Sequence, residues 1–337
     1  MTARGGAWVL ACALAVLACG GDRPLDDALF VPGWKRPRPP TAPAPVRAIG
    51  ATAELPAAVQ RALDPAFDYA PRPEPEPDDW LAQYPESGQT FDQYQGSTPN
   101  RPDDRRRVIY LLPIGALPAD VTPPLADLAD VVHAFFGLEV RVLPAAALAT
   151  VAPTTRTNPH TGKPQALAPD VLRWLSLQVP DDAYALMAVT MTDLYPEPSW
   201  NFVYGQATFT QRVGVQSFAR YDPAFFGEAR PADWRRTLVR RSAQVLVHEI
   251  AHMFGMAHCT HWHCVVAGAN HQAEFDRHPL HLCPVCLRKL WWAVGFDVAA
   301  REDALAAVWA RLGQADEAAW SAGRAARIRA APPATAP

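Results

Sequence analysis

Residues 248–258 read HEIAHMFGMAH, which places three imidazoles and one carboxylate at a spacing with a mechanical explanation. Positions i and i+4 of an α-helix lie nearly above one another, so His248 and His252 would point the same way. Gly255 can end the helix in a left-handed conformation, which lets His258 turn back toward the other two. The pattern predicts three nitrogen ligands around one metal ion, with Glu249 beside the first of them.

The residues before this stretch fit a helix with one buried face. Apolar side chains recur at spacings of three and four, as expected for a helix packed on a core. They are Val239, Ala243, Leu246, Ile250 and Phe254. Pro231 suits the opening of such a helix, since proline is tolerated in its first turn. A bare H-E-x-x-H also arises by chance, so the helical context together with Gly255 and His258 carries the prediction.

The residue types predict a particular chemistry. Three histidines around zinc leave the fourth tetrahedral position for water, which is typical of a catalytic rather than a structural site. Glu249 lies where its carboxylate can reach that water without binding the metal. We therefore expect Glu249 to act as the general base of a zinc-dependent hydrolysis.

Four cysteines follow the third histidine in two closely spaced pairs, Cys259 with Cys264 and Cys283 with Cys286. Two such pairs separated by a longer loop are typical of a closed tetrahedral zinc site, in which thiolates at about 2.3 Å exclude water. Two disulfides are an alternative for a protein outside the cytoplasm. A redox role for the C-P-V-C run at 283–286 is another, although no thioredoxin-like pattern surrounds it.

The combined motifs resemble one family. The long form H-E-x-x-H-x-x-G-x-x-H is the metzincin signature, and a third histidine followed at once by C-x4-C, and later by C-x2-C, is similar to the archaemetzincins. Other segments look like the same family, and the resemblance runs from roughly residue 80 to 300. They are residues 193–196, 201–207, 217–221, 274–277 and 280–283.

This resemblance implies a zinc-dependent peptidase that acts on peptide or protein substrates. It implies two zinc ions per chain, one catalytic on His248, His252 and His258, and one structural on the four cysteines. It also favours zinc over disulfides at the cysteines. The alternative is a zinc-stabilised binding protein that has kept both sites and lost efficient hydrolysis.

One position departs from the family pattern. Metzincins place a methionine in a tight turn beneath the zinc, and in archaemetzincins it lies two residues after the second cysteine. Val266 occupies that position here. Valine is shorter and stiffer than methionine, so we expect a changed floor beneath the histidines. Val266 is the observation that favours the non-catalytic alternative, whereas the intact Glu249 opposes it.

The pattern of elements predicts an α+β fold of metzincin type, with a mixed twisted sheet, backing helices and the active-site helix. Strands are expected at 108–112, 138–142, 184–192, 201–207 and 213–219, and helices at 125–135 and 169–178. The resemblance assigns the cleft-side antiparallel edge strand to 201–207. Residues after Gly255 should form a smaller zinc-stabilised subdomain, and Asp193 with Arg220 should form a polar pair or turn anchors.

The amino terminus predicts export. A short basic segment precedes an apolar run at residues 7–17, which is too short to span a bilayer and fits a signal peptide. Residues 16–19 resemble a bacterial lipobox, so Cys19 would carry the lipid and Cys12 would be removed. The alternative is an ordinary signal peptide cleaved near Ala18. We expect the bacterial cell envelope as the location, on its extracytoplasmic side, or secretion in the alternative case.

These observations divide the chain into a signal peptide (1–18), a lipid-anchored proline-rich linker (19–79), a peptidase domain (80–300) and C-terminal helices with a tail (301–337). Proline density before about residue 75 predicts a semi-rigid extended tether. Composition, with 49% hydrophobic and 19% charged residues, suits one sizeable core. A formal net charge of −3 gives no reason to expect nucleic acid as a partner.

Overall fold

A five-stranded mixed sheet organises the protein. The structure is a computed structural model that describes residues 45–66 and 68–330. The strand order is β2-β1-β5-β8-β7, formed by β1 (Val108–Ile114), β2 (Glu139–Val142), β5 (Ala183–Thr190), β7 (Gly205–Ala207) and β8 (Val213–Ser217). Neighbours are parallel except β7, which pairs antiparallel with β8 at the edge. The mixed sheet expected from the sequence is confirmed.

The central strands are buried on both faces because their alternate residues enter two different cores. Ile109 and Leu111 of β1 join the core on the side of the long helices, whereas Tyr110 and Leu112 join the core on the other side. All residues of β5 are buried, as is typical of a strand inside a parallel sheet. The near-continuous apolar runs in the sequence follow from this arrangement.

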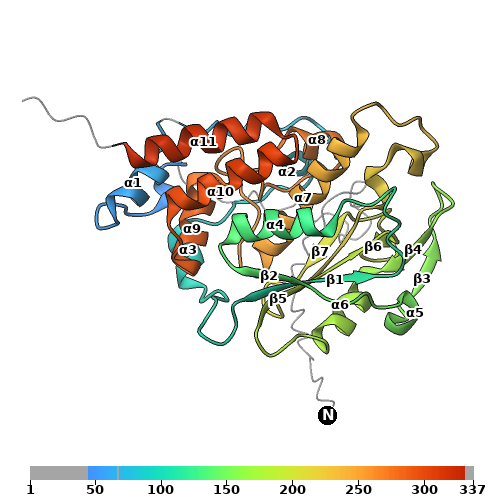
Figure 1. Cartoon of the computed structure of the whole chain (residues 1–337). Coiled ribbons are helices and arrows are strands. Elements are labelled where there is room, and N and C mark those ends of the chain that lie inside the picture. Colours follow the sequence, from blue (N-terminus) through green and yellow to red (C-terminus); the bar gives the residue numbers. More distant parts are fainter. Residues whose placement is uncertain (1–44, 67, 331–337) are drawn as a thin grey trace, which may run out of the picture.

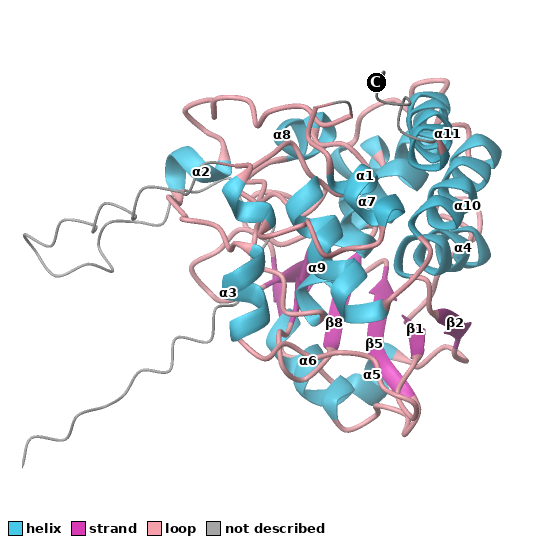
Figure 2. Cartoon of the chain, turned by 90° about the vertical axis from the view of Figure 1, so that its left-hand side faces the viewer, coloured by secondary structure: helices cyan, strands magenta, loops and turns pink. Residues whose placement is uncertain are grey.

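Helices cover the two faces (Figures 1 and 2). On one face α4 (Leu125–Phe136) packs against α7 (Trp234–Met253), and α7 lies against β5, β7 and β8. On the other, α6 (Ala168–Ser176) packs on β8, with the short α5 (Leu148–Val151) beside it. Gly137 ends α4 in the left-handed conformation predicted from the sequence. The helix that carries the histidine motif is therefore a core element of the fold.

The edge of the sheet differs in detail from the sequence prediction. A strand was expected over 201–207, but only β7 (Gly205–Ala207) pairs with β8. Val203 instead forms an isolated bridge with Leu194, which belongs to β6 (Asp193–Tyr195). A second sheet, of order β3-β4-β6, contains this strand together with β3 (Thr155–Thr157) and β4 (Pro164–Leu167). The chain thus changes partner between Val203 and Gly205, which a period-two pattern cannot reveal.

The segment before residue 80 is packed rather than extended. It contains a 3-10 turn, η2 (Arg47–Ile49), and α1 (Ala57–Leu63). α1 contacts two helices near the C-terminus, α9 (Pro284–Val294) and α11 (Ala315–Arg329). Val59, Ala62 and Leu63 are buried. The extended tether predicted to about residue 75 is therefore wrong for residues 45–63, whereas residues 71–77 carry no helix or strand and are mostly exposed. The prolines flank the helix at positions 56 and 65 and do not interrupt it.

After α7 the chain is mostly helical. It forms α8 (Gln272–Arg277), α9 (Pro284–Val294), α10 (Val298–Arg311) and α11 (Ala315–Arg329). The terminal helices expected near 301–329 are present, but the boundary drawn at residue 300 falls inside α10. Because α10 also packs against α4, the last helices complete the main core.

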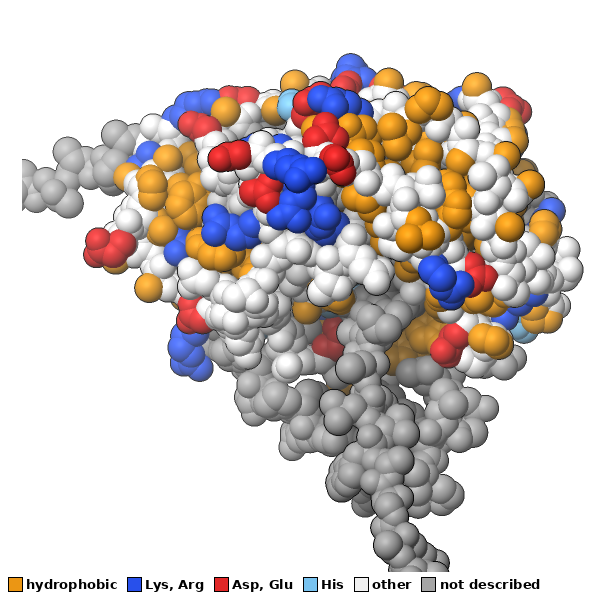
Figure 3. Space-filling model, turned by 90° about the horizontal axis from the view of Figure 1, so that it is seen from below, with side chains coloured by type: hydrophobic (Ala, Val, Ile, Leu, Met, Phe, Trp, Pro, Cys, Tyr) orange, Lys and Arg blue, Asp and Glu red, His pale blue; other side chains and the backbone are white. Residues whose placement is uncertain are grey.

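The surface mixes charge signs. In Figure 3, seen from below, basic and acidic side chains lie next to one another, with hydrophobic side chains between them. Exposed ion pairs such as Arg106 with Asp103 contribute to this pattern. Within residues 45–66 and 68–330, no helix has the length and apolar character needed to cross a membrane.

Candidate active site

The active-site helix α7 carries His248, Glu249 and His252 in its buried last turns. The Nε2 atoms of His248 and His252 lie 3.0 Å apart, one helical turn from each other, as predicted. The helix ends at Met253, and Gly255 adopts a φ of 80°. This left-handed residue redirects the chain so that His258 returns to the same point, and the three side chains offer nitrogens within 4.8 Å of one another.

Hydrogen bonds assign which nitrogen of each ring faces the centre. Nδ1–H of His248 donates to the carbonyl of Val265 at 2.9 Å, and Nδ1–H of His252 donates to that of Met256 at 2.7 Å. Nδ1–H of His258 donates to the carboxylate of Glu86 at 3.2 Å. Each Nε2 is therefore the ring nitrogen that keeps a lone pair, and the three can converge.

This arrangement fits a metal ion. The lone pairs of His248 and His252 face each other at 3.0 Å, which is unfavourable unless a cation lies between them. Nε2 of His258 is buried and has no hydrogen-bond partner among the described residues. Ligand nitrogens about 2.0–2.1 Å from a tetrahedral zinc lie roughly 3.3 Å apart, so only a small adjustment is needed.

Electrostatics keep two of the imidazoles neutral, which is the form that binds metal. Burial lowers the pKa of His248 to about 3 and lowers the pKa of His252 well below its usual value. The neighbouring rings act in the same direction, because each disfavours a second positive charge nearby. Both ligands are thus ready to bind over the whole neutral pH range.

Glu249 lies between the active-site helix and the edge strand. It is fully buried, and a Cβ placed on Gly205 of β7 would come within 2.7 Å of its Oε1 and 2.8 Å of its Cγ. Only glycine leaves space at this position for the carboxylate. The strand at the rim of the site therefore shapes the place of the candidate general base, a role for Gly205 that the sequence analysis did not identify.

The turn that follows Cys264 supports the histidine site through backbone hydrogen bonds. The carbonyl of Val265 accepts from His248, and the carbonyl of Val266 accepts from the N–H of Cys259 at 2.9 Å. Val266 is completely buried. Gly268 follows, where a Cβ would lie 2.7 Å from Nδ1 of His258 and 2.6 Å from the Trp80 ring. The turn is thus packed closely against the third histidine.

His258 is held from outside by the N-terminal segment. The Trp80 ring meets it edge-on, with centroids 5.1 Å apart, and Nε1–H of Trp80 donates to Oε1 of Glu86 at 3.0 Å. Burial alone would raise the pKa of Glu86, but His258, Trp80 and Arg72 together lower it below its usual value. No motif marks Glu86 or Trp80, and the sequence analysis missed both.

The four cysteines form one buried cluster. Cys259, Cys264, Cys283 and Cys286 offer Sγ atoms within 4.8 Å of one another, and Sγ of Cys259 lies 3.5 Å from Sγ of Cys283. All four are free thiols, so neither disulfide of the alternative hypothesis is present. Complete burial of the C-P-V-C pair also opposes thiol exchange with a partner.

The electrostatics of this cluster call for a cation. Hydrogen bonds from the other three thiols lower the pKa of Cys259 well below its usual value, whereas burial raises the pKa of Cys264 and Cys283. One thiolate forms readily, but further negative charges need a metal between them. Backbone N–H groups of Cys283 and Cys286 point at sulfur, at 3.3 and 3.5 Å. The donor set suits a closed zinc site.

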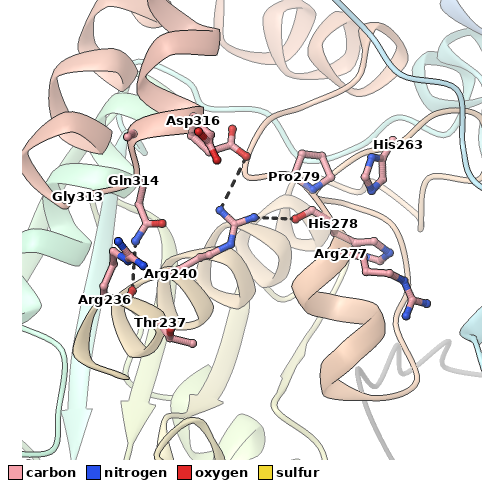
Figure 4. Close-up of a pocket in the computed structure, with 12 residues that line it drawn as sticks. Arg236, Thr237, Arg240, His263, Arg277, His278, Pro279, Gly313, Gln314 and Asp316 are labelled. Carbon is pink, nitrogen blue, oxygen red and sulfur yellow. Dashed lines mark hydrogen bonds and ion pairs between the residues drawn. The ribbon is translucent and has the colours of Figure 1, made fainter. Parts of the chain in front are cut away.

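One cavity of the protein is not part of the site. A cavity of about 570 Å³ lies beside the first half of α7 (Figure 4). Arg240 there donates to the carbonyl of His278 at 3.1 Å and lies 3.9 Å from Glu317. None of the candidate ligands lines this cavity. Some of the charged side chains that line it already form ion pairs within the protein. Arg236, for example, lies 2.9 Å from Asp233.

The polar pair expected from Asp193 and Arg220 is present. Nε of Arg220 donates to Asp193 at 2.8 Å, both side chains are buried, and the guanidinium lies over the Phe202 ring at 3.6 Å. His261 and His263 belong neither to the histidine group nor to the cysteine group.

Comparison with known proteins agrees with this geometry. A sequence profile described as peptidase family M54 matches residues 166–291. Archaemetzincin-2 of Macaca fascicularis is 37% identical over 278 residues, which cover 73% of this chain and 76% of the relative. The chain belongs to the archaemetzincin family. Its human relative, Archaemetzincin-2 of Homo sapiens, is 36% identical over the same shares.

Archaemetzincins are metallopeptidases, and this chain is a hydrolase of that class. Among solved structures, the archaemetzincin of Methanopyrus kandleri is 26% identical, with a TM-score of 0.43 over 57% of this chain and 97% of the other. The profile match begins at residue 166, so Trp80 and Glu86 lie outside it.

Proposed function

We propose that this archaemetzincin hydrolyses peptide bonds at a zinc ion held by His248, His252 and His258, with Glu249 as the general base. The observation that carries the proposal is the convergence of three imidazoles whose Nδ1 atoms are all engaged elsewhere. Family membership supports the reaction class.

In the proposed reaction Glu249 would carry out two proton transfers. When bound, zinc supplies Lewis acidity toward the scissile carbonyl and the attacking water. The Glu249 carboxylate takes one proton from that water, and the new C–O bond forms as the oxygen attacks the carbonyl carbon. Glu249 then delivers the proton to the leaving nitrogen as the C–N bond breaks. Burial against Gly205 restricts the carboxylate to a narrow range of positions for both transfers.

Substrate binding would use the edge of the sheet. β7 is the last strand of the sheet and antiparallel to its neighbour, and Gly205 on it adjoins Glu249. An extended peptide could add to such an edge through backbone hydrogen bonds. Peptides in extended conformation are therefore the proposed substrates.

We further propose a second, structural zinc on Cys259, Cys264, Cys283 and Cys286, which gives two zinc ions per chain. Its support is a buried set of four thiols within 4.8 Å of one another, with backbone N–H groups directed at sulfur. Because Cys259 follows His258 directly, ordering one site would help to place a ligand of the other.

The proposed location is the bacterial cell envelope, with a lipid on Cys19 as the membrane anchor. Its support lies only in the sequence of residues 1–19, which are outside the described residues. Replacing Cys19 with alanine should abolish lipid labelling and move the protein from the membrane fraction to the soluble one. An unlabelled wild-type protein in its native host would refute the anchor.

The test of the proposed activity is cleavage of a diverse peptide mixture, followed by mass spectrometry. Wild-type protein should produce new termini, and Glu249→Ala should lower the rate by about 10²–10⁴-fold while keeping its zinc. His252→Ala should lose one zinc as well as activity. If wild-type protein binds zinc at the histidines but cleaves nothing, the non-catalytic alternative takes the place of this proposal.

A further inference from the structure

The chain between the end of α7 and the first cysteine shares several backbone hydrogen bonds with a segment distant in sequence. Residues 254–259 have no regular secondary structure. Four of their backbone groups bond to side chains of residues 70–94, which we name the arm, and others bond to α7 and to Val266. The bonds are Tyr94 to the Phe254 carbonyl, Gln89 to the Gly255 carbonyl and Ala257 N–H, and Arg72 to the Cys259 carbonyl. Backbone groups buried in a loop need such partners.

The arm is itself firmly anchored. The Trp80 N–H donates to Glu274 of α8 at 2.9 Å, and Arg277 donates to Asp79 at 2.6 Å; Figure 2 shows α2 (Trp80–Gln83) on the same side as α8. Asp79, His271 and Glu274 lie close enough to suggest a third metal site. However, Arg277 and backbone N–H groups already bind these side chains. The cluster is accounted for as an anchor.

Among the three histidines, His258 has a different kind of outer partner. His248 and His252 donate to backbone carbonyls 17 and 4 residues away in sequence, whereas His258 donates to a carboxylate 172 residues away. A carboxylate behind an imidazole fixes its tautomer and ring orientation and makes the opposite nitrogen a stronger ligand. The helix supplies no such restraint for His258, because that residue lies beyond its end.

We propose that Glu86 is a positioning residue for the catalytic metal, acting through His258, and that the arm thereby sets how tightly the histidine site holds zinc. Trp80 supports this role in two ways. Its Nε1–H donates to Oε1 of Glu86. Its ring contacts His258 edge-on and occupies space that a side chain at position 268 would fill. The proposal rests on the proposed function, since it requires zinc at the three histidines.

The experiment measures the rate at which full-length protein loses zinc to a colorimetric chelator. Loss of an outer partner typically weakens metal binding by about 10–100-fold, so Glu86→Ala should release one zinc about that much faster than wild type. Glu86→Gln should lie between them, because its amide oxygen can still accept both hydrogen bonds without the charge. Trp80→Phe should accelerate release in the same direction, since it removes the N–H donor together with part of the ring that packs on His258.

The matched control is Glu74→Ala, which removes an exposed carboxylate from the same arm. It should release both zinc ions at the wild-type rate. The slowly released cysteine-bound zinc should be unchanged in every arm variant, which separates a local effect from unfolding. If Glu86→Ala does not fold, the isosteric Glu86→Gln and Trp80→Phe still decide the question.

Two failures can be told apart. If His252→Ala contains as much zinc as wild type, the histidines do not hold zinc and the proposed function fails. If His252→Ala loses one zinc but Glu86→Gln, Trp80→Phe and any folded Glu86→Ala release theirs at the wild-type rate, the proposed function stands and the role of Glu86 is wrong.

Discussion

The histidine and cysteine clusters meet at one peptide bond, between His258 and Cys259, yet they are stabilised in different ways. The four thiols point at one another and at backbone N–H groups of their own segment, residues 259–286. The imidazoles instead direct their Nδ1 atoms outward, to carbonyl groups and to Glu86. The histidine cluster therefore keeps its outer hydrogen bonds without metal, whereas the thiols would be left with each other and a few long bonds to backbone groups.

The largest expected effect tests this difference directly. Cys283→Ala should destabilise the fold far more than His252→Ala, although each should lose one zinc. Metal binding to structural sites supplies on the order of 10 kcal/mol of folding free energy in small zinc domains. Thermal unfolding together with zinc content measures both quantities. Equal losses of stability in the two variants would show that the clusters play the same structural part.

A second prediction concerns precision at the histidine site. Gly205→Ala would place a Cβ 2.7 Å from Oε1 and 2.8 Å from Cγ of Glu249, so the buried carboxylate must shift from its position. A displacement of about 1 Å can lower a rate by roughly 10²-fold. We expect peptide cleavage to fall by about that factor, with zinc content close to wild type.

The control for this substitution is Gly96→Ala, where a Cβ meets nothing within 4 Å. Its activity and stability should match the wild-type values. A Gly205→Ala enzyme as active as the control would mean that the carboxylate position near β7 is not the productive one.

The smallest expected effect concerns Val266 at the junction of the two clusters. Val266→Met should fill a gap left by the shorter side chain, slow zinc release from the histidines, and leave turnover equal or higher. The adjacent Val265→Met is the control, because extra side-chain volume in a packed core costs roughly 1–3 kcal/mol. Both valines are fully buried. Faster zinc release from Val266→Met would show that its neighbours have already repacked around valine.

The sequence alone predicted which side chains gather in each cluster because their geometry is local. His248 and His252 are related by one helical turn, and Gly255 needs only a left-handed φ to return His258. The cysteine pairs likewise lie within residues 259–286, and the second pair is at the start of α9. The apolar runs of β1 and β5 indicated buried strands for the same reason, because each residue of such a run is apolar where its strand is buried on both faces.

What the sequence did not reveal depends on contacts between distant segments. Glu86 reaches His258 across 172 positions, Gly205 of β7 makes room for Glu249 of α7, and α1 is buried only because α9 and α11 cover it. None of these residues carries a periodic or spaced pattern. Local spacing fixes which atoms can bind a metal, whereas the outer partners and the space around them arise only when the sheet, the arm and the last helices pack together.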